Sequence, residues 1–480
     1  MSFSSLTHTL SQLTHWEQKR LQKLVDSPYF NTDQRMGRLL HHMLAHPEDN
    51  DRERLHHIAD PSLDYRYKRL NNWLSDLNEL VEEFLVQEQL RQDRPQRHIL
   101  LMKSCQQRGL DRQYQKAGRG YERMAQRNET EDTETLHWHG YQIALWEDRH
   151  ALEQRRPQME FLQQGIASLE QAYLIALLKA ACQWRNRQNV IQAEDTRFWE
   201  GILAEMKVRL KREDLTPLAG LYQQVWLTLD DPEDVSHFQH LVHALDQRRA
   251  EVSKGELKPL YQYAQNYCIK QANQGKLEYL STLFELYQAM IDLGLIFHQG
   301  YLQPADLKNI VTLGVRLERF SWTQEFLDSH AQYLPAEGRE GIIAYNQAYL
   351  LHAKGELRQA LRHLREAELT DVYYYLGARC LLLKIYFELQ DHEGLEGQLE
   401  AFARTLRRNK TISAYQRRIH LNLVSHLRRL SQLLVAAPSL DTKQYQKRWQ
   451  ELKQEVDTQP EIANVGWLRK QVLRAEGEGR

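Results

Sequence analysis

His137 and His139 form the most ligand-like histidine pair in the sequence. Histidines at positions i and i+2 bind one metal ion together when they lie on a β-strand, whose alternate side chains share a face. On an α-helix the same two side chains point about 200° apart and cannot share a metal. The other pairs, His41-His42 and His56-His57, have no zinc-type spacing around them. We therefore predict no metal and no other cofactor.

Motifs for nucleotide binding and for catalysis are incomplete. The chain contains neither a GxxxxGK[ST] loop nor a GxGxxG loop, and we interpret Gly118-Arg119-Gly120 as a turn. Some helical ribonucleases use an arginine, a polar residue and, a few residues later, a histidine. Arg127-Asn128 lies too far before His137 for this pattern, and Arg408-Asn409 has no histidine at the required distance. The sequence predicts a protein without enzymatic activity, with an unrecognised helical hydrolase as a third hypothesis.

Two basic segments stand out in a chain whose net charge is −1. Residues 91–127 hold ten Lys or Arg and three acidic residues. Residues 401–440 hold no acidic residue and eight basic ones: Arg404, Arg407, Arg408, Lys410, Arg417, Arg418, Arg428 and Arg429. Exposed basic segments bind an acidic partner or the phosphates of a nucleic acid. The alternative is a solvated helical face whose charges are balanced by acids of neighbouring helices.

The elements that position these residues are expected to be helices. Only 22 of the 480 residues are Gly and 12 are Pro, whereas average usage gives about 34 and 24. Both residues break helices, so their scarcity favours long helices with short connections. Strand-like alternation never extends beyond about five residues, and a β-sheet is not expected. The predicted fold class is all-α.

The cysteines and the N-terminal sequence indicate the cellular compartment. Cys105, Cys182, Cys268 and Cys380 are widely spaced and form no CxxC motif, which is typical of reduced thiols in a cytosolic protein. The opening residues lack the basic and apolar regions of a signal peptide. We find no window of about 18 apolar residues and expect no membrane span. These features predict a cytoplasmic protein without membrane contact.

Three segments are distinguished by their patterns. Residues 1–93 are predicted to form an N-terminal helical domain. A polar stretch with Pro95 separates them from residues 94–300, a degenerate array of helical hairpins. Residues 301–480 are predicted to form clearer helical repeats with C-terminal capping helices.

Several helix ends are predicted from short motifs. Thr14 and Glu17 match a capping box, in which each residue bonds the backbone amide of the other. Tyr29-Phe30 follows the end of the same helix and is expected to enter the core. Thr216-Pro217 and Asp231-Pro232 each place a proline in a first helical turn, after a capping residue.

The clearest repeat begins near residue 340. Small and apolar residues line one helix face, and a turn follows at Gly355. A second helix face then carries Leu357, Ala360, Leu361, Leu364 and Ala367. The pattern recurs about 35 residues later, a period typical of stacked helix–turn–helix units. We expect Ala360 and Ala367 to be buried between the two helices of one hairpin.

These residues resemble the tetratricopeptide (TPR) family. Gly355 matches the turn glycine of the family, and Ala360 and Ala367 match its two small packing positions. The sequence departs from the family where Ala344 replaces the usual Trp and Val372 the closing Pro. The resemblance implies a TPR-like α-α superhelix, or solenoid, of antiparallel helical hairpins.

The whole chain is also similar to a group of uncharacterised bacterial all-helical proteins. This similarity rests on three short stretches, residues 27–31, residues 319–322 with Leu334-Pro335, and residues 406–410. It implies a fold and no activity.

The resemblance also directs attention to the first helices of the repeats. One TPR subtype clamps a C-terminal carboxylate with Lys and Asn side chains. Asn346 stands at one such position, but Tyr345 and Tyr349 stand where Lys and Asn are expected. Together with Arg379 and Lys384, these tyrosines either line a partner groove or pack in the core.

The sequence therefore predicts a non-enzymatic protein–protein interaction scaffold that holds a protein or peptide partner. Stacked hairpins create extended surfaces suited to recognition, and no converging set of catalytic groups is visible. The alternative is a helical protein that binds nucleic acid through residues 91–127 and 401–440. The candidate partner-binding residues are Arg404, Arg407, Arg408, Lys410, Arg417, Arg418, Tyr345, Asn346, Tyr349, Arg379 and Lys384.

Overall fold

The computed structural model describes residues 3–126, 133–153, 155–156, 158–188, 201–202, 208, 215–367, 369, 371–459 and 461–476. Within these residues the regular elements are α-helices, apart from the 3-10 turns η1 (Ala331–Tyr333) and η2 (Ala437–Ser439) and one antiparallel pair, β1 (Phe297–His298) with β2 (Tyr301–Leu302). The all-α prediction is confirmed. The chain forms two compact units, Met1–Leu174 and Ile175–Arg480.

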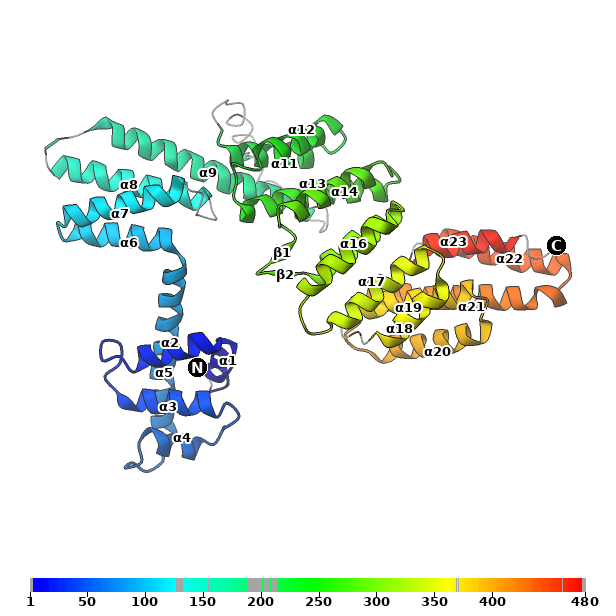
Figure 1. Cartoon of the computed structure of the whole chain (residues 1–480), viewed down its shortest axis with the longest axis horizontal. Helices are drawn as coiled ribbons and strands as arrows, with labels where there is room; N and C mark the ends of the chain where they lie inside the picture. Colours follow the sequence, from blue (N-terminus) through cyan, green and yellow to red (C-terminus); the bar gives the residue numbers. More distant parts are fainter. Residues whose placement is uncertain are drawn as a thin grey trace. The chain divides into compact units, whose positions relative to one another are not determined.

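The first unit begins with a domain of five helices (Figure 1). They are α1 (Phe3–Gln12), α2 (His15–Val25), α3 (Gln34–Ala45), α4 (Arg52–Ala59) and α5 (Tyr67–Gln92). Their buried side chains form one hydrophobic core. The buried side chains of α5 repeat at helical spacing, through Leu70, Trp73, Leu74, Leu77, Val81 and Phe84.

Two local predictions in this domain have different outcomes. The capping box is confirmed, because the Glu17 amide donates to the Thr14 hydroxyl and the Thr14 amide donates to the Glu17 carboxylate. The prediction that Tyr29 enters the core is wrong, since this side chain is 86% exposed. The Asn31 side chain donates to the carbonyl oxygen of Val25 and closes the turn with Tyr29 on the outside.

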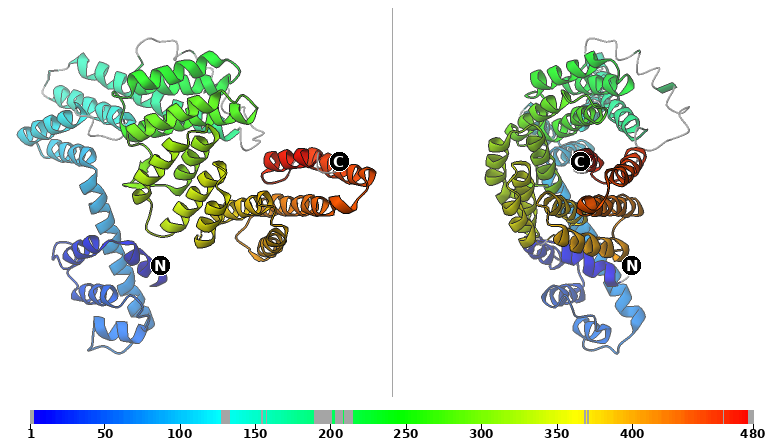
Figure 2. Two further views of the ribbon diagram at one scale, coloured as in Figure 1. Left: turned by 45° about the vertical axis from the view of Figure 1, so that its right-hand side comes forward. Right: turned by 90° about the vertical axis from the view of Figure 1, so that its right-hand side faces the viewer.

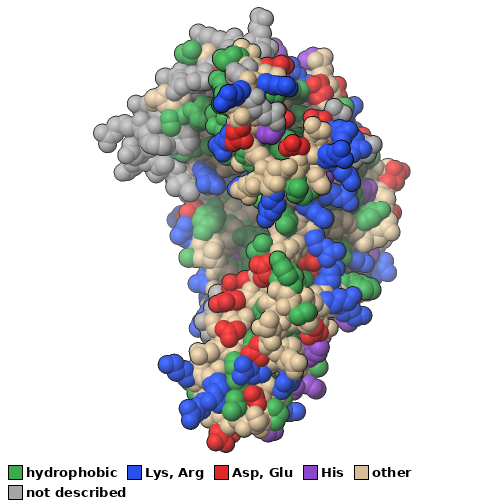
Figure 3. Space-filling model, turned by 90° about the vertical axis from the view of Figure 1, so that its left-hand side faces the viewer, with side chains coloured by type: hydrophobic (Ala, Val, Ile, Leu, Met, Phe, Trp, Pro, Cys, Tyr) green, Lys and Arg blue, Asp and Glu red, His purple; other side chains and the backbone are tan. Residues whose placement is uncertain are grey.

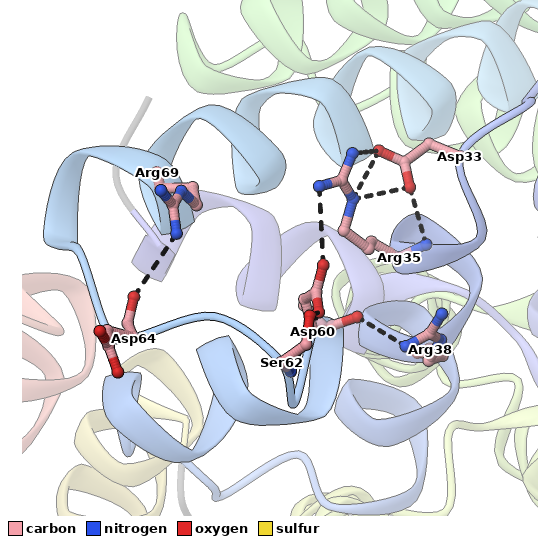
Figure 4. Close-up of polar contacts among 8 residues, drawn as sticks. Asp33, Arg35, Arg38, Asp60, Ser62, Asp64 and Arg69 are labelled. Atoms are coloured by element: carbon pink, nitrogen blue, oxygen red, sulfur yellow. Dashed lines mark hydrogen bonds and ion pairs between the residues drawn. The ribbon is translucent and has the colours of Figure 1, made fainter.

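Arginines of α3 hold the start of the connection between α4 and α5 (Figure 4). Arg35 pairs with Asp33 at 2.7 Å and with Asp60 at 3.9 Å. Arg38 donates to the carbonyl oxygen of Ala59 at 2.9 Å. Asp60 and its neighbour Ala59 are thereby tied to α3, so the chain leaves α4 in a defined direction.

The first unit continues through three helices, α6 (Arg94–Gln107), α7 (Asp111–Gln126) and α8 (Thr133–Glu153), into α9 (Met159–Gln188), which crosses the boundary between the units. The interpretation of Gly118-Arg119-Gly120 as a turn is wrong, because these residues lie inside α7. A Cβ added at Gly120 would lie 2.5 Å from the His98 ring. Glycine at this position therefore permits the close approach of α6 and α7.

Helix α9 is long and apolar enough to cross a membrane, by length and composition alone. The stretch Met159–Arg187 contains a window with mean hydropathy 1.2, of which 39% is buried. The window is interrupted by polar and charged residues, so it is not an unbroken apolar run, and one such helix is weak evidence for a membrane span. In the C-terminal half of α9, Ile175, Leu178, Ala181 and Cys182 lie in the core of the second unit.

The second unit is a row of antiparallel helical hairpins that lie side by side (Figure 2). The first helices are α11 (Pro217–Asp230), α13 (Lys254–Asn273), α15 (Pro304–Arg316), α17 (Arg339–Ala353), α19 (Val372–Glu388) and α21 (Ala414–Ala436). The second helices are α12 (Val235–Arg248), α14 (Tyr279–Asp292), α16 (Phe320–His330), α18 (Leu357–Glu366), α20 (His392–Arg408) and α22 (Thr442–Thr458), and α23 (Val465–Arg474) follows. This arrangement is a helical repeat, as predicted.

Small residues shape these hairpins largely where the sequence indicates. Gly355 joins α17 to α18 with a φ of +80°, which a side chain rarely adopts. Ala348 and Ala360 are fully buried. The prediction that Ala367 is buried is wrong, because α18 ends at Glu366 and Ala367 is its half-buried C-cap.

The two helix starts predicted at Thr216-Pro217 and Asp231-Pro232 have different outcomes. Thr216 caps α11 by accepting from the Ala219 amide, as predicted. Asp231 instead ends α11, and α12 begins at Val235 after Asp234, whose carboxylate accepts from the Ser236 amide. The second prediction is wrong because a closer capping carboxylate follows the proline.

The four cysteines are buried and form no disulfide, as predicted. Burial raises the pKa of Cys268 to about 12. This thiol therefore stays protonated at neutral pH and serves as a small apolar side chain.

Candidate partner-binding surfaces

Helices α20 and α21 carry the acid-free segment, residues 401–440. Asp391 caps α20 by accepting from the Gly394 amide at 2.9 Å. The helix ends at Arg408, and the side chain of Asn409 accepts from the Thr411 amide in the turn that follows. These caps place the first four basic residues of the segment in the last turns of α20 and just beyond them.

Four of the eight basic residues have acidic partners outside the segment. The pairs are Arg404 with Glu400, Arg418 with Glu461, Arg428 with Glu396 and Arg429 with Glu455. Arg418 donates two hydrogen bonds to Glu461, at 2.5 and 2.7 Å. For these four residues the structure therefore corresponds to the alternative interpretation, a solvated helical face whose basic charges are balanced by acidic side chains.

The side chain of Arg417 is engaged in hydrogen bonds within the chain. Its guanidinium donates to the carbonyl oxygens of Leu406, Asn409 and Ile412, at 2.9, 3.1 and 3.2 Å. The last carbonyls of a helix have no partner within it and need external donors. Arg417 supplies them for α20 and thereby holds the turn to α21, so it is unsuited to bind a partner.

Three basic residues of the segment are left exposed. Arg407 and Arg408 end α20, and Lys410 follows in the turn. Among the described residues none of the three has an ion pair. Cations are favoured at a helix C-terminus by its dipole, which stabilises them only modestly. We call Arg407, Arg408 and Lys410 the cationic end of α20.

The predicted groove residues of α17 pack within the chain. Tyr345 is 6% exposed and lies against Tyr349 and Tyr374, with ring centroids 6.4 and 5.2 Å away. Asn346 is 1% exposed and donates to the carbonyl oxygen of Ile342. Of the two interpretations of these tyrosines, a partner groove or packing in the core, the geometry supports packing in the core.

Lys308 of α15 joins this cluster, although the sequence does not single it out. Its ammonium nitrogen lies 5.3 Å from the Tyr345 ring centroid and 5.2 Å from that of Tyr374. It also donates to the carbonyl oxygen of Tyr373 at 3.4 Å. Burial lowers the pKa of Lys308, and the ring faces partly compensate its lost hydration. Only the stacking of three hairpins brings these residues together.

Arg379 and Lys384 of α19 are also engaged within the chain. Arg379 donates to the side-chain oxygen of Gln398 at 3.1 Å. Lys384 donates to Asn464 at 2.7 Å and lies 5.7 Å from the Trp467 ring centroid, and burial lowers its pKa. Residues near the start of α23 therefore occupy the part of α19 that the sequence proposes as a groove.

The other basic segment runs from the end of α5 through α6 and α7, with Arg127 outside the described residues. Exposed cations on α7 repeat at i, i+4, i+7 and i+11 spacing, which places them along one side of the helix. They are Arg112, Lys116, Arg119 and Arg123, and none has an ion pair within the described part of the chain. We call these four residues the α7 row. The spacing is visible in the sequence, but a count of charges does not reveal it.

The wider charge pattern gives no single-sign surface on the face drawn in Figure 3. Basic side chains there are interspersed with acidic and hydrophobic ones. Within the described residues, no group of three or more His, Cys, Asp or Glu side chains could hold a metal ion. His137 and His139 lie on α8, where His139 is hydrogen-bonded to Gln96.

Comparisons with protein-family models, with curated proteins and with solved structures found no match to this chain. The geometry alone therefore defines its class: a helical-repeat protein that presents two exposed cationic surfaces, the cationic end of α20 and the α7 row.

Proposed function

We propose that the chain is a non-enzymatic scaffold that binds an acidic protein partner, with the cationic end of α20 as a docking contact. One observation carries this proposal. Five of the eight basic residues in residues 401–440 are engaged within the chain, whereas Arg407, Arg408 and Lys410 are exposed without acidic partners among the described residues. As part of the proposal, the second unit is a TPR-like solenoid of a bacterial cytoplasmic protein.

The array supports this function by holding the contact rigidly. The buried side chains of α20 belong to the continuous core of the second unit, so its C-terminal turn has a fixed position. Exposed arginines and lysines attract carboxylates and raise the rate of encounter, and salt screens this attraction. We therefore expect partner binding that weakens as ionic strength rises.

Affinity capture from cell lysate tests the proposal. One variant reverses the cationic end of α20 to glutamate (Arg407→Glu, Arg408→Glu, Lys410→Glu). A matched control reverses three exposed cations of the α17–α18 hairpin (Lys354→Glu, Arg358→Glu, Arg362→Glu), with the same change in net charge. We expect a protein partner that the parent and the control retain, that the α20 variant loses and that nuclease treatment leaves bound. An α20 variant that retains every partner of the parent would contradict the proposal.

A second candidate function is nucleic-acid binding, and the α7 row favours it. Its four cations are exposed, unpaired within the described residues and aligned along one helix, as expected for contacts with successive phosphates. A third variant, Arg112→Glu with Lys116→Glu and Arg119→Glu, carries the same charge change as the other two. This candidate predicts captured nucleic acid that the α7 variant alone fails to retain. Capture of no nucleic acid by the parent at low salt would contradict it.

A further inference from the structure

A cavity of about 420 Å³ lies in the first unit, between α7, α8 and the beginning of α9. This volume is within the range of small-molecule sites. Aromatic side chains from three helices line it: Tyr114 of α7, Trp146 of α8 and Phe161 of α9. Gln106 of α6 donates to the carbonyl oxygen of Trp146 at 3.2 Å and so ties α8 to α6 beside the cavity.

Two polar groups of this lining have no hydrogen-bond or ion-pair partner among the described residues. The hydroxyl of Tyr114 is buried and makes no hydrogen bond within the part of the chain that the structure describes. Glu147 is half-buried and, among the described residues, has neither an ion pair nor a hydrogen bond. Burial, together with the charge of Glu122, raises the pKa of Glu147. A buried polar group without a partner is costly, and a bound ligand would remove that cost.

The charges of the lining select the class of ligand. Asp111, Glu147 and Glu153 are acidic, whereas Arg156 is the one residue of the lining that is always cationic. His150 also lines the cavity, and it already has an interaction within the chain. The excess of carboxylates disfavours an anion, and the ring faces of Trp, Tyr and Phe attract organic cations.

We propose that this cavity binds a small organic ammonium ion, held between the aromatic rings of Tyr114, Trp146 and Phe161 and the carboxylate of Glu147. The carboxylate supplies the counter-charge, and the hydroxyl of Tyr114 accepts a hydrogen bond from the ligand or from a water beside it. The rings replace the hydration of the cation on its other sides. A bare metal ion does not fit this lining, because the described residues offer no group of three ligating side chains.

Calorimetric titration of the full chain with choline and with tetramethylammonium tests the proposal. We expect saturable binding of at least one cation, and at least about tenfold weaker binding of 3,3-dimethylbutan-1-ol, the uncharged analogue of choline. Glu147→Gln should weaken cation binding by about tenfold, whereas Glu79→Gln, an exposed carboxylate on α5, should leave it unchanged.

Tyr114→Phe separates a ligand contact from a structural role. Removal of an unpartnered buried hydroxyl should keep or raise the melting temperature of the free protein, while cation binding weakens. Two results would overturn the proposal. One is no saturable binding of either cation up to ~10 mM, and the other is equally tight binding of the uncharged analogue.

Discussion

Lys384 donates a hydrogen bond to the side-chain oxygen of Asn464 at 2.7 Å, across 80 residues of sequence. Trp467, one turn into α23, lies beside the same lysine and donates to Glu388 at 2.7 Å. Burial alone would raise the pKa of Glu388, but hydrogen bonds from His352 and Trp467 hold it below its usual value. The C-terminal segment thus packs against α19 and engages Lys384, one of the residues that the sequence proposes for a partner groove.

This fastening depends on the backbone of Asn464 as well as its side chain. Asn464 has a φ of +53°, a conformation that asparagine and glycine tolerate better than other residues. Asn464→Gly removes only the hydrogen bond, whereas Asn464→Ala removes it and adds backbone strain. We expect the alanine variant to be less stable than the glycine variant by about 1 kcal/mol. Urea unfolding measures the difference, and equal stabilities would show that the strain is relieved elsewhere.

The contact between α15 and α16 depends on Gly314. A Cβ added there would overlap the hydroxyl oxygen of Thr323, which is fully buried and donates to the carbonyl oxygen of Arg319. Gly314→Ala should therefore destabilise the protein by about 1–3 kcal/mol, because it overpacks a tight contact. Calorimetric or urea unfolding tests this value.

Gly397 provides the matched control for that substitution. It lies inside α20, and an added Cβ would meet no atom within 4 Å. Gly397→Ala should stabilise the protein by about 0.5–1 kcal/mol, since alanine has the higher helix propensity. Similar effects for the two substitutions would contradict the close contact at Gly314.

Buried His56 predicts a dependence of stability on pH. It lies between the rings of Tyr65 and Trp73, is 1% exposed, and its Nε2 has no hydrogen-bond partner among the described residues. Burial, with the charge of Arg69, lowers the pKa of His56 below its usual value of 6.5. As the pH falls through 6.5, the unfolded chain binds a proton that the folded chain does not. Stability should therefore decrease from this pH down to the lowered pKa.

Unfolding free energies measured from pH ~7.5 to ~5 test this expectation. His56→Phe keeps an aromatic ring at the site and removes the titrating group, so the variant should lose less stability over this range than the parent. His420 also has a pKa lowered by burial and contributes the same sign in both proteins. An identical pH dependence in parent and variant would show that His56 does not contribute.

The local features of the fold were predictable from short stretches of sequence. The capping box of Thr14 and Glu17 and the turn at Gly355 involve residues a few positions apart, whose geometry follows from the helix itself. The apolar positions of α5 likewise repeat with the helical period. Such signals depend little on the rest of the chain, so the all-α class followed from them.

Features set by distant contacts could not be predicted in this way. The glycine pair around Gly120 indicates a turn in the sequence, since the packing partner that requires a glycine there, His98, lies on another helix. The residues 401–440 looked uncompensated because the acid nearest to Arg418 is Glu461, 43 residues later. The cavity beside Glu147 depends on three helices at once. The candidate sites predicted from the sequence therefore differ more from the structure than the predicted fold class does.

The most direct test of the scaffold proposal is the affinity for the captured protein partner as a function of salt. The comparison includes the parent, the variant that reverses Arg407, Arg408 and Lys410, and the control that reverses Lys354, Arg358 and Arg362. We expect similar melting temperatures for the three proteins, because exposed charges contribute little to stability, and affinities for parent and control that fall steeply as salt rises. The α20 variant should bind at least about tenfold more weakly at low salt. Equal affinity of the α20 variant and the parent at low salt would contradict the scaffold proposal.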